Sequence, residues 1–241
     1  MCGVGTALLL AIAVAQSPPP ARVPVVIELF SSEGCSSCPP ADLVLAALDQ
    51  KQLFGGIQVL ALEEHVDYWN HLGWRDPFSS PKFTERQNDL DTGSNAQAYT
   101  PQLWVDGAEE INGAEGELVA RTIAKAALEE KGRVTVGVDV SDVTATVGRL
   151  PRGKSGTAFL AITERGLSTA VRRGENAGRT VEHGPVVRRL VELGKVPAVG
   201  GTLRAPLELA PGWNRDRLRV VVFVQQSNGR IVAAGDCGVG R

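Results

Sequence analysis

The sequence predicts a chain of two domains, an α/β domain with parallel strands followed by a small β-rich domain. The first half alternates buried apolar runs with helical segments, which is typical of strand–helix–strand units. From residue 133 onward, short alternating runs are separated by Gly, Pro and Asn-Gly turns, which indicate many short strands. With 241 residues, the chain is long enough to build both cores.

The first domain is predicted over residues 23–132 and begins with a buried strand. Val23–Phe30 is an apolar, β-branched run that contains one acid, as in a strand buried on both faces. A helix is expected from Pro39 to about Phe54, because prolines fit only the first turn of a helix. Ile57–Leu62 follows as a second strand, and the short crossover makes the two strands parallel.

The rest of this domain is predicted to contain an insertion, a hairpin and a final helix. The connection Glu63–Tyr99 holds a helix over Ser79–Leu90, and Pro101–Val105 and Glu109–Asn112 have the pattern of a hairpin. Glu117–Lys131 is an amphipathic helix. This is the element order of the thioredoxin and glutaredoxin core. We therefore expect an α/β thioredoxin-like domain with a helical insertion, followed by a small β-rich, sandwich-like C-terminal domain.

The C-terminal domain is predicted over residues 133–241, with the boundary near Gly132. Its expected strands are Val134–Val140, Val143–Val147, Thr157–Thr163, Thr202–Leu209, Leu218–Gln225 and Ile231–Ala234. A helix is predicted within Pro185–Leu193, and His183 is expected on the surface. Nothing in this half indicates catalysis, so its expected role is docking or stability.

The N-terminal residues indicate export. Val4–Ala15 is an apolar run too short to span a bilayer, and it ends in a small-x-small pattern that signal peptidases cleave. We predict a signal peptide over 1–15 and a Pro-rich linker over 16–22, with the mature chain periplasmic or extracellular and without stable membrane insertion. The alternative is a disordered apolar tail.

The charge balance excludes some classes of partner. The chain has 25 Lys and Arg against 27 Asp and Glu, so it lacks the basic surface needed for nucleic acid or an anionic membrane. The expected partners are therefore protein or small-molecule thiols and disulfides, together with a redox partner protein.

Three of the cysteines lie in the predicted mature chain. Cys35 and Cys38 are separated by two residues and form a natural pair, whereas Cys237 is left over. Cys237 is expected to be a buried small hydrophobe, a resolving thiol or a cross-link to another chain.

Cys35 and Cys38 are the predicted catalytic residues. A cysteine at a helix start meets unpaired N–H groups and the positive end of the helix dipole, both of which favour the thiolate. Cys35 would attack a substrate disulfide, and Cys38 would resolve the mixed disulfide, with no cofactor. The alternatives are a structural disulfide and a metal site.

Thr100, Pro101 and Glu28 are further candidates near this centre. Thr100-Pro101 stands where thioredoxin-like proteins carry a cis-proline that positions the substrate. Glu28 is an acid in a buried strand, so it either accepts the Cys38 proton or is paired with a cation.

A metal-handling alternative involves the loop after the second strand. His65 and Asp67 would bind copper or another metal together with the thiolates of Cys35 and Cys38. Trp69 in the same loop either lines a substrate groove or packs the insertion against the core.

Several motifs resemble one known family. They are Glu28–Asp42, His65–Asn70, Gly73–Phe78, Tyr99–Gln102 and Gly174–Thr180. Together they look like the secreted bacterial family called domain of unknown function 1223. The resemblance implies a thioredoxin-like fold, but that family has no established reaction.

The sequence thus predicts an exported thiol–disulfide oxidoreductase-like protein with a Cys-x-x-Cys centre. One alternative is a module that handles copper or another metal. Another is a non-catalytic binding module in which the disulfide is only structural.

Overall fold

The computed structural model describes residues 22–52, 54–94 and 97–240. The predicted signal peptide and all but the last residue of the predicted linker lie outside these ranges. In the described part of the chain, no helix has both the length and the apolar character needed to cross a bilayer.

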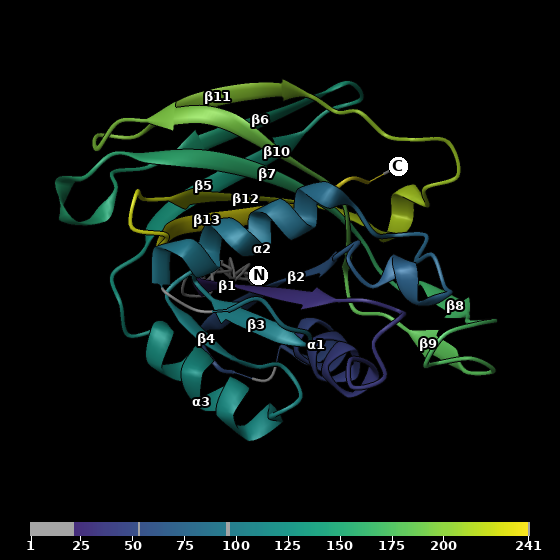
Figure 1. Cartoon of the computed structure of the whole chain (residues 1–241). Coiled ribbons are helices and arrows are strands. Elements are labelled where there is room, and N and C mark those ends of the chain that lie inside the picture. Colours follow the sequence, from purple (N-terminus) through teal and green to yellow (C-terminus); the bar gives the residue numbers. More distant parts are fainter. Residues whose placement is uncertain (1–21, 53, 95–96, 241) are drawn as a thin grey trace, which may run out of the picture.

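One sheet of eleven strands dominates the molecule (Figure 1). Its strand order is β11-β6-β5-β13-β12-β7-β10-β2-β1-β3-β4, and β8 and β9 form a separate pair. The strands are β1 (Val23–Ser31), β2 (Ile57–His65), β3 (Gln102–Val105), β4 (Glu109–Asn112), β5 (Gly132–Val138), β6 (Asp142–Val147), β7 (Gly156–Glu164), β8 (Ser168–Ala170), β9 (Thr180–Glu182), β10 (Val186–Val196), β11 (Gly201–Pro206), β12 (Leu218–Gln225) and β13 (Ile231–Gly238). The helices are α1 (Pro39–Lys51), α2 (Pro81–Ser94) and α3 (Gly116–Ala126).

The predicted fold class is wrong. The protein is not a thioredoxin-like α/β domain with a helical insertion followed by a separate sandwich. It consists mostly of strands, and strands from both halves belong to one mixed sheet. The halves meet where β10 runs parallel to β2, with Val186 opposite Glu63. The main-chain N–H of Glu63 also donates to the carbonyl of Pro185 at 3.0 Å.

The segment predicted as a helix within Pro185–Leu193 is the strand that makes this join. Its apolar residues do not alternate as they do in a regular half-buried strand. The structure explains the broken pattern, because β10 carries register shifts between Val187 and Arg189 and between Glu192 and Gly194. Each bulge places an extra residue in the strand and disrupts the two-residue alternation. Pairing with β7 along its whole length then fixes the segment as a strand.

Four apolar cores hold the sheet and helices together, and the smallest consists of Phe30, Val66, Leu90 and Trp104. Alternate residues of β1 and β2 pack against α1 and α3, the two helices drawn below the sheet in Figure 1. The opposite face of β1 and β2 packs against β7, β10 and β12, with Phe83 of α2 in the same cluster. A third core fills the space among β5, β6, β7 and β12. The predicted insertion helix is therefore part of the core that the two halves share.

Parallel pairing of β1 with β2 sets the position of the candidate site. The register runs from Val23 opposite Ile57 to Ser31 opposite His65, so both strands end at the same edge of the sheet. The cysteine turn follows β1 at this edge, and the polar end of β2 lies beside it. Segments that are distant in sequence thus converge at one sheet edge.

Candidate functional site

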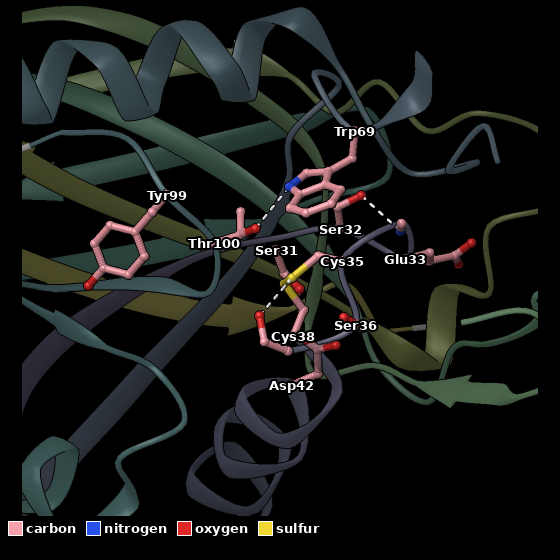
Figure 2. Close-up of a disulfide and its surroundings, with 12 residues drawn as sticks. Ser31, Ser32, Glu33, Cys35, Ser36, Cys38, Asp42, Trp69, Tyr99 and Thr100 are labelled. Atoms are coloured by element: carbon pink, nitrogen blue, oxygen red, sulfur yellow. Dashed lines mark hydrogen bonds between the residues drawn. A yellow bond between two sulfur atoms is a disulfide. The ribbon is translucent and has the colours of Figure 1, made fainter. Parts of the chain in front are cut away.

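The cysteine turn connects β1 to α1. Cys35 and Cys38 form a disulfide whose Cα atoms are 5.5 Å apart. Cys38 is the N-cap of α1, and two prolines occupy the first turn of that helix, as predicted. The N–H of Cys35 donates to the carbonyl of Ser32, and that of Cys38 donates to the carbonyl of Cys35. The pair is therefore held in a tight turn directly before the helix (Figure 2).

The unpaired N–H groups that were expected to support a thiolate at Cys35 are largely absent from the first turn of α1. Pro39 and Pro40 have no N–H, and the N–H of Ala41 already donates to the carbonyl of Cys38 at 2.8 Å. The side-chain partner of the Cys35 sulfur is Ser37, whose Oγ lies 3.4 Å away. The groups left to support an anion at this sulfur are this hydroxyl and the helix dipole.

A loop over residues 171–179, here called the capping loop, lies against the cysteine turn. The side-chain amide of Asn176 donates to the carbonyls of Glu33, at 3.0 Å, and Cys35, at 2.8 Å. The N–H of Ser36 donates to a carboxylate oxygen of Glu175 at 3.0 Å. Cys35 and Cys38 are both fully buried. The disulfide is thus closed off from solvent, and the capping loop is bonded to its turn.

Thr100 and Pro101 lie close to the turn, and the peptide bond between them is cis. Trp69 connects the two regions, because its indole N–H donates to the Thr100 hydroxyl at 2.9 Å. A Cβ on Gly34 would lie 3.1 Å from the Cβ of Trp69, so the glycine allows this close approach. Figure 2 shows the Trp69 ring between Thr100 and the cysteine turn.

Glu28 lies on the other face of β1, away from α1. Its carboxylate accepts two hydrogen bonds from Arg86 of α2, at 2.8 and 3.1 Å, and both side chains are buried. The guanidinium also lies over the rings of Phe159 and Phe223. This is the cation-paired alternative that the sequence left open. A proton-accepting role for Glu28 toward Cys38 stays a prediction.

Five buried side chains at the same sheet edge form a histidine–carboxylate cluster. The members are Glu33, Glu63, His65, Asp76 and His183. His65 bonds to Asp76 through Nδ1, at 2.6 Å, and to Glu63 through Nε2, at 2.8 Å. His183 bonds to Glu63 through Nδ1 and to Glu33 through Nε2, both at 3.1 Å. Every imidazole nitrogen in the cluster therefore contacts a carboxylate.

Further donors hold the carboxylates of the cluster in place. The Trp74 indole N–H donates to Glu33 at 2.7 Å, and the Glu33 main-chain N–H donates to Asp76 at 2.8 Å. The N–H of Gly184 donates to the second oxygen of Glu63. These bonds fix both the position and the orientation of each acid.

The cluster shifts the pKa values of its members in opposite directions. Burial opposes charge on both histidines, but Asp76 and Glu63 raise the pKa of His65 well above its usual range. Glu33 and Glu63 raise that of His183 to about 9. Burial raises the pKa of Glu63, but hydrogen bonds from His183 and His65 outweigh it and lower the value to about 2. Hydrogen bonding to His65 likewise lowers the pKa of Asp76, so the cluster favours charged imidazoles beside the ionised forms of Glu63 and Asp76.

Asp42 lies in the first turn of α1, next to Cys38 (Figure 2). Its carboxyl accepts a hydrogen bond from the Ser31 hydroxyl at 2.6 Å, and its N–H donates to the carbonyl of Cys38. Burial and the charge of Glu63 raise the pKa of Asp42 well above its usual range. The side chain is therefore a buried acid with a raised pKa, four residues beyond Cys38.

Two other residues singled out in the sequence lie outside the cluster. Asp67 accepts a hydrogen bond from the Thr84 hydroxyl of α2 at 2.6 Å, whereas His65 points into the cluster. The structure therefore separates these two predicted metal ligands. Cys237 is a free, partly exposed thiol near the end of β13, and its Sγ contacts the carbonyl of Gly238.

The sequence did not identify Glu33, Glu63, Asp76, Asn176 or His183 as site residues. The expectation that His183 lies on the surface is wrong, because it is only 5% exposed. The available signal was the strand itself, since Glu63 and His65 are two residues apart and share one face of β2. His183 carried no comparable signal, because it reaches the cluster through the β10–β2 pairing.

Fold and site define a mixed β-sheet protein with a buried disulfide and a histidine–carboxylate cluster at one sheet edge. The chain belongs to the family described as "Protein of unknown function (DUF1223)", whose model matches residues 26–225. The predicted family is therefore confirmed.

Two solved structures are similar over most of the chain. The crystal structure of protein AGR_C_4864 from Agrobacterium tumefaciens is 25% identical with a TM-score of 0.74, covering 94% of this chain and 97% of that one. HBP35 of Porphyromonas gingivalis is 17% identical with a TM-score of 0.67, covering 91% of this chain and 76% of that one. The second likeness concerns the fold alone. No curated protein matches the chain.

Proposed function

We propose that the protein exchanges thiols and disulfides through Cys35 and Cys38, acting outside the cytoplasm on protein or small-molecule thiols. The observation that supports this most is the disulfide itself, in a tight turn directly before α1 and beside Thr100-Pro101. The location is inferred from the predicted signal peptide.

The proposed reaction is a two-electron exchange. A substrate thiolate attacks one sulfur of the Cys35–Cys38 disulfide, and the other cysteine leaves as a thiolate. A second substrate thiol then attacks the mixed disulfide, which releases an oxidised substrate and the reduced pair. Two electrons and two protons pass to the cysteines, and a second disulfide-bearing partner takes them away to restore the resting state. Reduction of a substrate disulfide is the reverse of these steps.

Asp42 is suited to handle the proton at Cys38. It holds its own proton because burial and Glu63 raise its pKa. A buried acid of this kind gives a proton to a departing thiolate and takes it back during resolution. Asp42 therefore replaces Glu28 as the preferred candidate, since the Glu28 carboxylate is bonded to Arg86 on the opposite face.

We expect the capping loop to move when exchange occurs. Both sulfurs are buried, and attack on a disulfide requires access along the sulfur–sulfur axis. Displacing Asn176 and Glu175 removes the bonds from this loop to the cysteine turn. Access to the disulfide is thus coupled to opening of the loop.

The proposal is tested with single cysteine variants of the mature chain. Wild-type protein should accelerate insulin reduction or the oxidative refolding of a reduced protein, and Cys35→Ser should abolish that activity. Cys237→Ser is the matched control, because it removes the free thiol and keeps the pair. Equal activity in Cys35→Ser and wild type would refute the proposal.

A titration in glutathione buffers separates exchange from a structural bridge. A redox-active pair equilibrates with the glutathione couple, at roughly −180 to −320 mV across compartments. A pair that stays oxidised at the reducing end of this range, in a protein without activity, is a structural disulfide. That result would favour the binding-module alternative.

A further inference from the structure

Two of the three histidines in the chain converge on a single carboxylate oxygen. His65 Nε2 lies 2.8 Å from Glu63 Oε1, and His183 Nδ1 lies 3.1 Å from the same atom. The three inward atoms all lie within 4.8 Å of one another. All three side chains are buried, so they are held in place by the surrounding fold.

The outward nitrogens of the two histidines are also fixed. His65 Nδ1 bonds to Asp76 at 2.6 Å, and His183 Nε2 bonds to Glu33 at 3.1 Å. In metal sites a ligating histidine almost always donates its other ring N–H to a carboxylate, a carbonyl or water, which sets its tautomer and its orientation. Both histidines have this arrangement, and the second nitrogen of each ring points toward Glu63.

We propose that Glu63, His65 and His183 bind a divalent first-row transition metal ion, with Zn²⁺ as the best match. Two imidazole nitrogens and one carboxylate oxygen are ligands that suit zinc, which takes them at about 2.0–2.2 Å. Ligand atoms around a tetrahedral ion of that size lie roughly 3.3 Å apart. The contacts at 2.8 and 3.1 Å therefore need to widen by a few tenths of an ångström. The two imidazole nitrogens, which lie within 4.8 Å of each other, need to come closer as the ion enters between them.

The charge of the cluster also suits a divalent ion. The side chains of Glu33, Glu63 and Asp76 surround the two imidazoles. Three buried acids are therefore in place to compensate a divalent cation bound between His65, His183 and Glu63.

The proposed site does not include the thiols. Cys35 and Cys38 are joined as a disulfide, and Asp67 is bonded to Thr84. The ligand set is thus different from the one predicted from the sequence, which combined His65 and Asp67 with both thiolates. Metal binding here is independent of thiol exchange, so the two proposals fail or succeed separately.

The test is a metal titration of the full mature chain in its oxidised form. The protein is stripped with a chelator and titrated calorimetrically with Zn²⁺, with metal content measured after dialysis. We expect one ion per chain in wild type and a loss of affinity above about 100-fold in His183→Gln. His71→Gln is the matched control, because the third histidine is exposed and lies outside the cluster. It should bind like wild type.

A second variant covers the outcome in which His183→Gln fails to fold. Glu33→Gln keeps all three ligands and should weaken binding by about 10–100-fold while keeping one ion per chain. Substituting Co²⁺ reports the ligand type, since a nitrogen and oxygen site lacks the intense thiolate absorption. Three results would overturn the proposal: no binding by folded wild type, binding lost equally in His71→Gln, or a thiolate spectrum that disappears in Cys35→Ser.

Discussion

Glu63 and Glu64 are neighbours in β2 and both are fully buried, yet their side chains lie on opposite faces of the sheet. Glu63 faces the histidine–carboxylate cluster, where His65 and His183 lower its pKa to about 2. Glu64 faces Glu28 and α2. Burial and the charge of Glu28 raise its pKa well above the usual range, against the opposing effect of Arg86.

The protonation of a buried acid is decided by its hydrogen-bond donors rather than by its depth. Glu63 receives hydrogen bonds from His65, His183 and Gly184. Glu64 receives no such donor, because Arg86 bonds to Glu28 and Gln225, and its neutral carboxyl is instead favoured by the neighbouring Glu28. The first acid is thus held charged, and the second is held neutral.

The largest effect is expected from Arg86→Met. This change leaves the Glu28 carboxylate buried without its cation, and breaking a buried pair in this way costs about 3–5 kcal/mol. The free energy of unfolding, measured in urea, should fall by that amount. The comparison predicts that the loss arises on the Glu64 face alone, so the metal affinity of the cluster should stay the same.

Arg152→Met is the matched control for that measurement. Arg152 pairs with Glu129 on the surface, with the two side chains 67% and 46% exposed, so its loss should cost less than about 1 kcal/mol. If Arg86→Met loses no more unfolding free energy than Arg152→Met, Glu28 becomes neutral when its partner is removed. The contrast between the two faces would then depend on Arg86 far less than the geometry indicates.

The sequence predicted the strands and helices of the first half but ended the second strand too early. That strand was expected to stop at Leu62, because the charged run Glu63–His65 follows. In the structure, β2 continues through all three residues. Their burial is tolerated because His183 and Arg86 arrive from other elements, and neither partner could be inferred from β2 itself.

The cysteine turn was predictable because its pattern is local. Two cysteines and two prolines within Cys35–Pro40 specify a bonded turn before a helix, and the structure has both. The cluster depends instead on contacts across long stretches of chain, since Glu63 and His183 are 120 residues apart. Those contacts follow from the β10–β2 join, which the bulges of β10 concealed.

A smaller effect on stability is expected from Asn176→Ala, on the Glu63 side. The variant loses both bonds from the capping loop to the carbonyls of Glu33 and Cys35, at a cost of about 1–3 kcal/mol. If the lost bonds destabilise the closed conformation of the loop relative to the open one, the open population grows. The rate at which a phosphine reduces the disulfide should then rise by about 5–150-fold. Thiol labelling followed by mass spectrometry gives this rate.

Asn214→Ala is the control for loop opening. Asn214 caps the short 3-10 turn Arg215–Arg217, so its loss also affects stability but leaves the capping loop bonded. Its rate of reduction should match wild type. Equal acceleration in both variants would indicate that global unfolding, rather than the capping loop, limits access to the disulfide.

The smallest effect, and the one with the opposite sign, is expected from Glu64→Gln. The pKa of Glu64 is raised in the folded state, so above its usual value of 4.5 the folded protein binds more protons than the unfolded chain. Stability therefore falls as pH rises through that region, and Gln removes the fall. Urea unfolding should give wild type and variant within about 1 kcal/mol at pH 4, and a more stable variant at pH 7. A variant that is less stable than wild type at pH 7 would show that Glu64 is charged and stabilised, as Glu63 is, and that the two faces of β2 treat their acids alike.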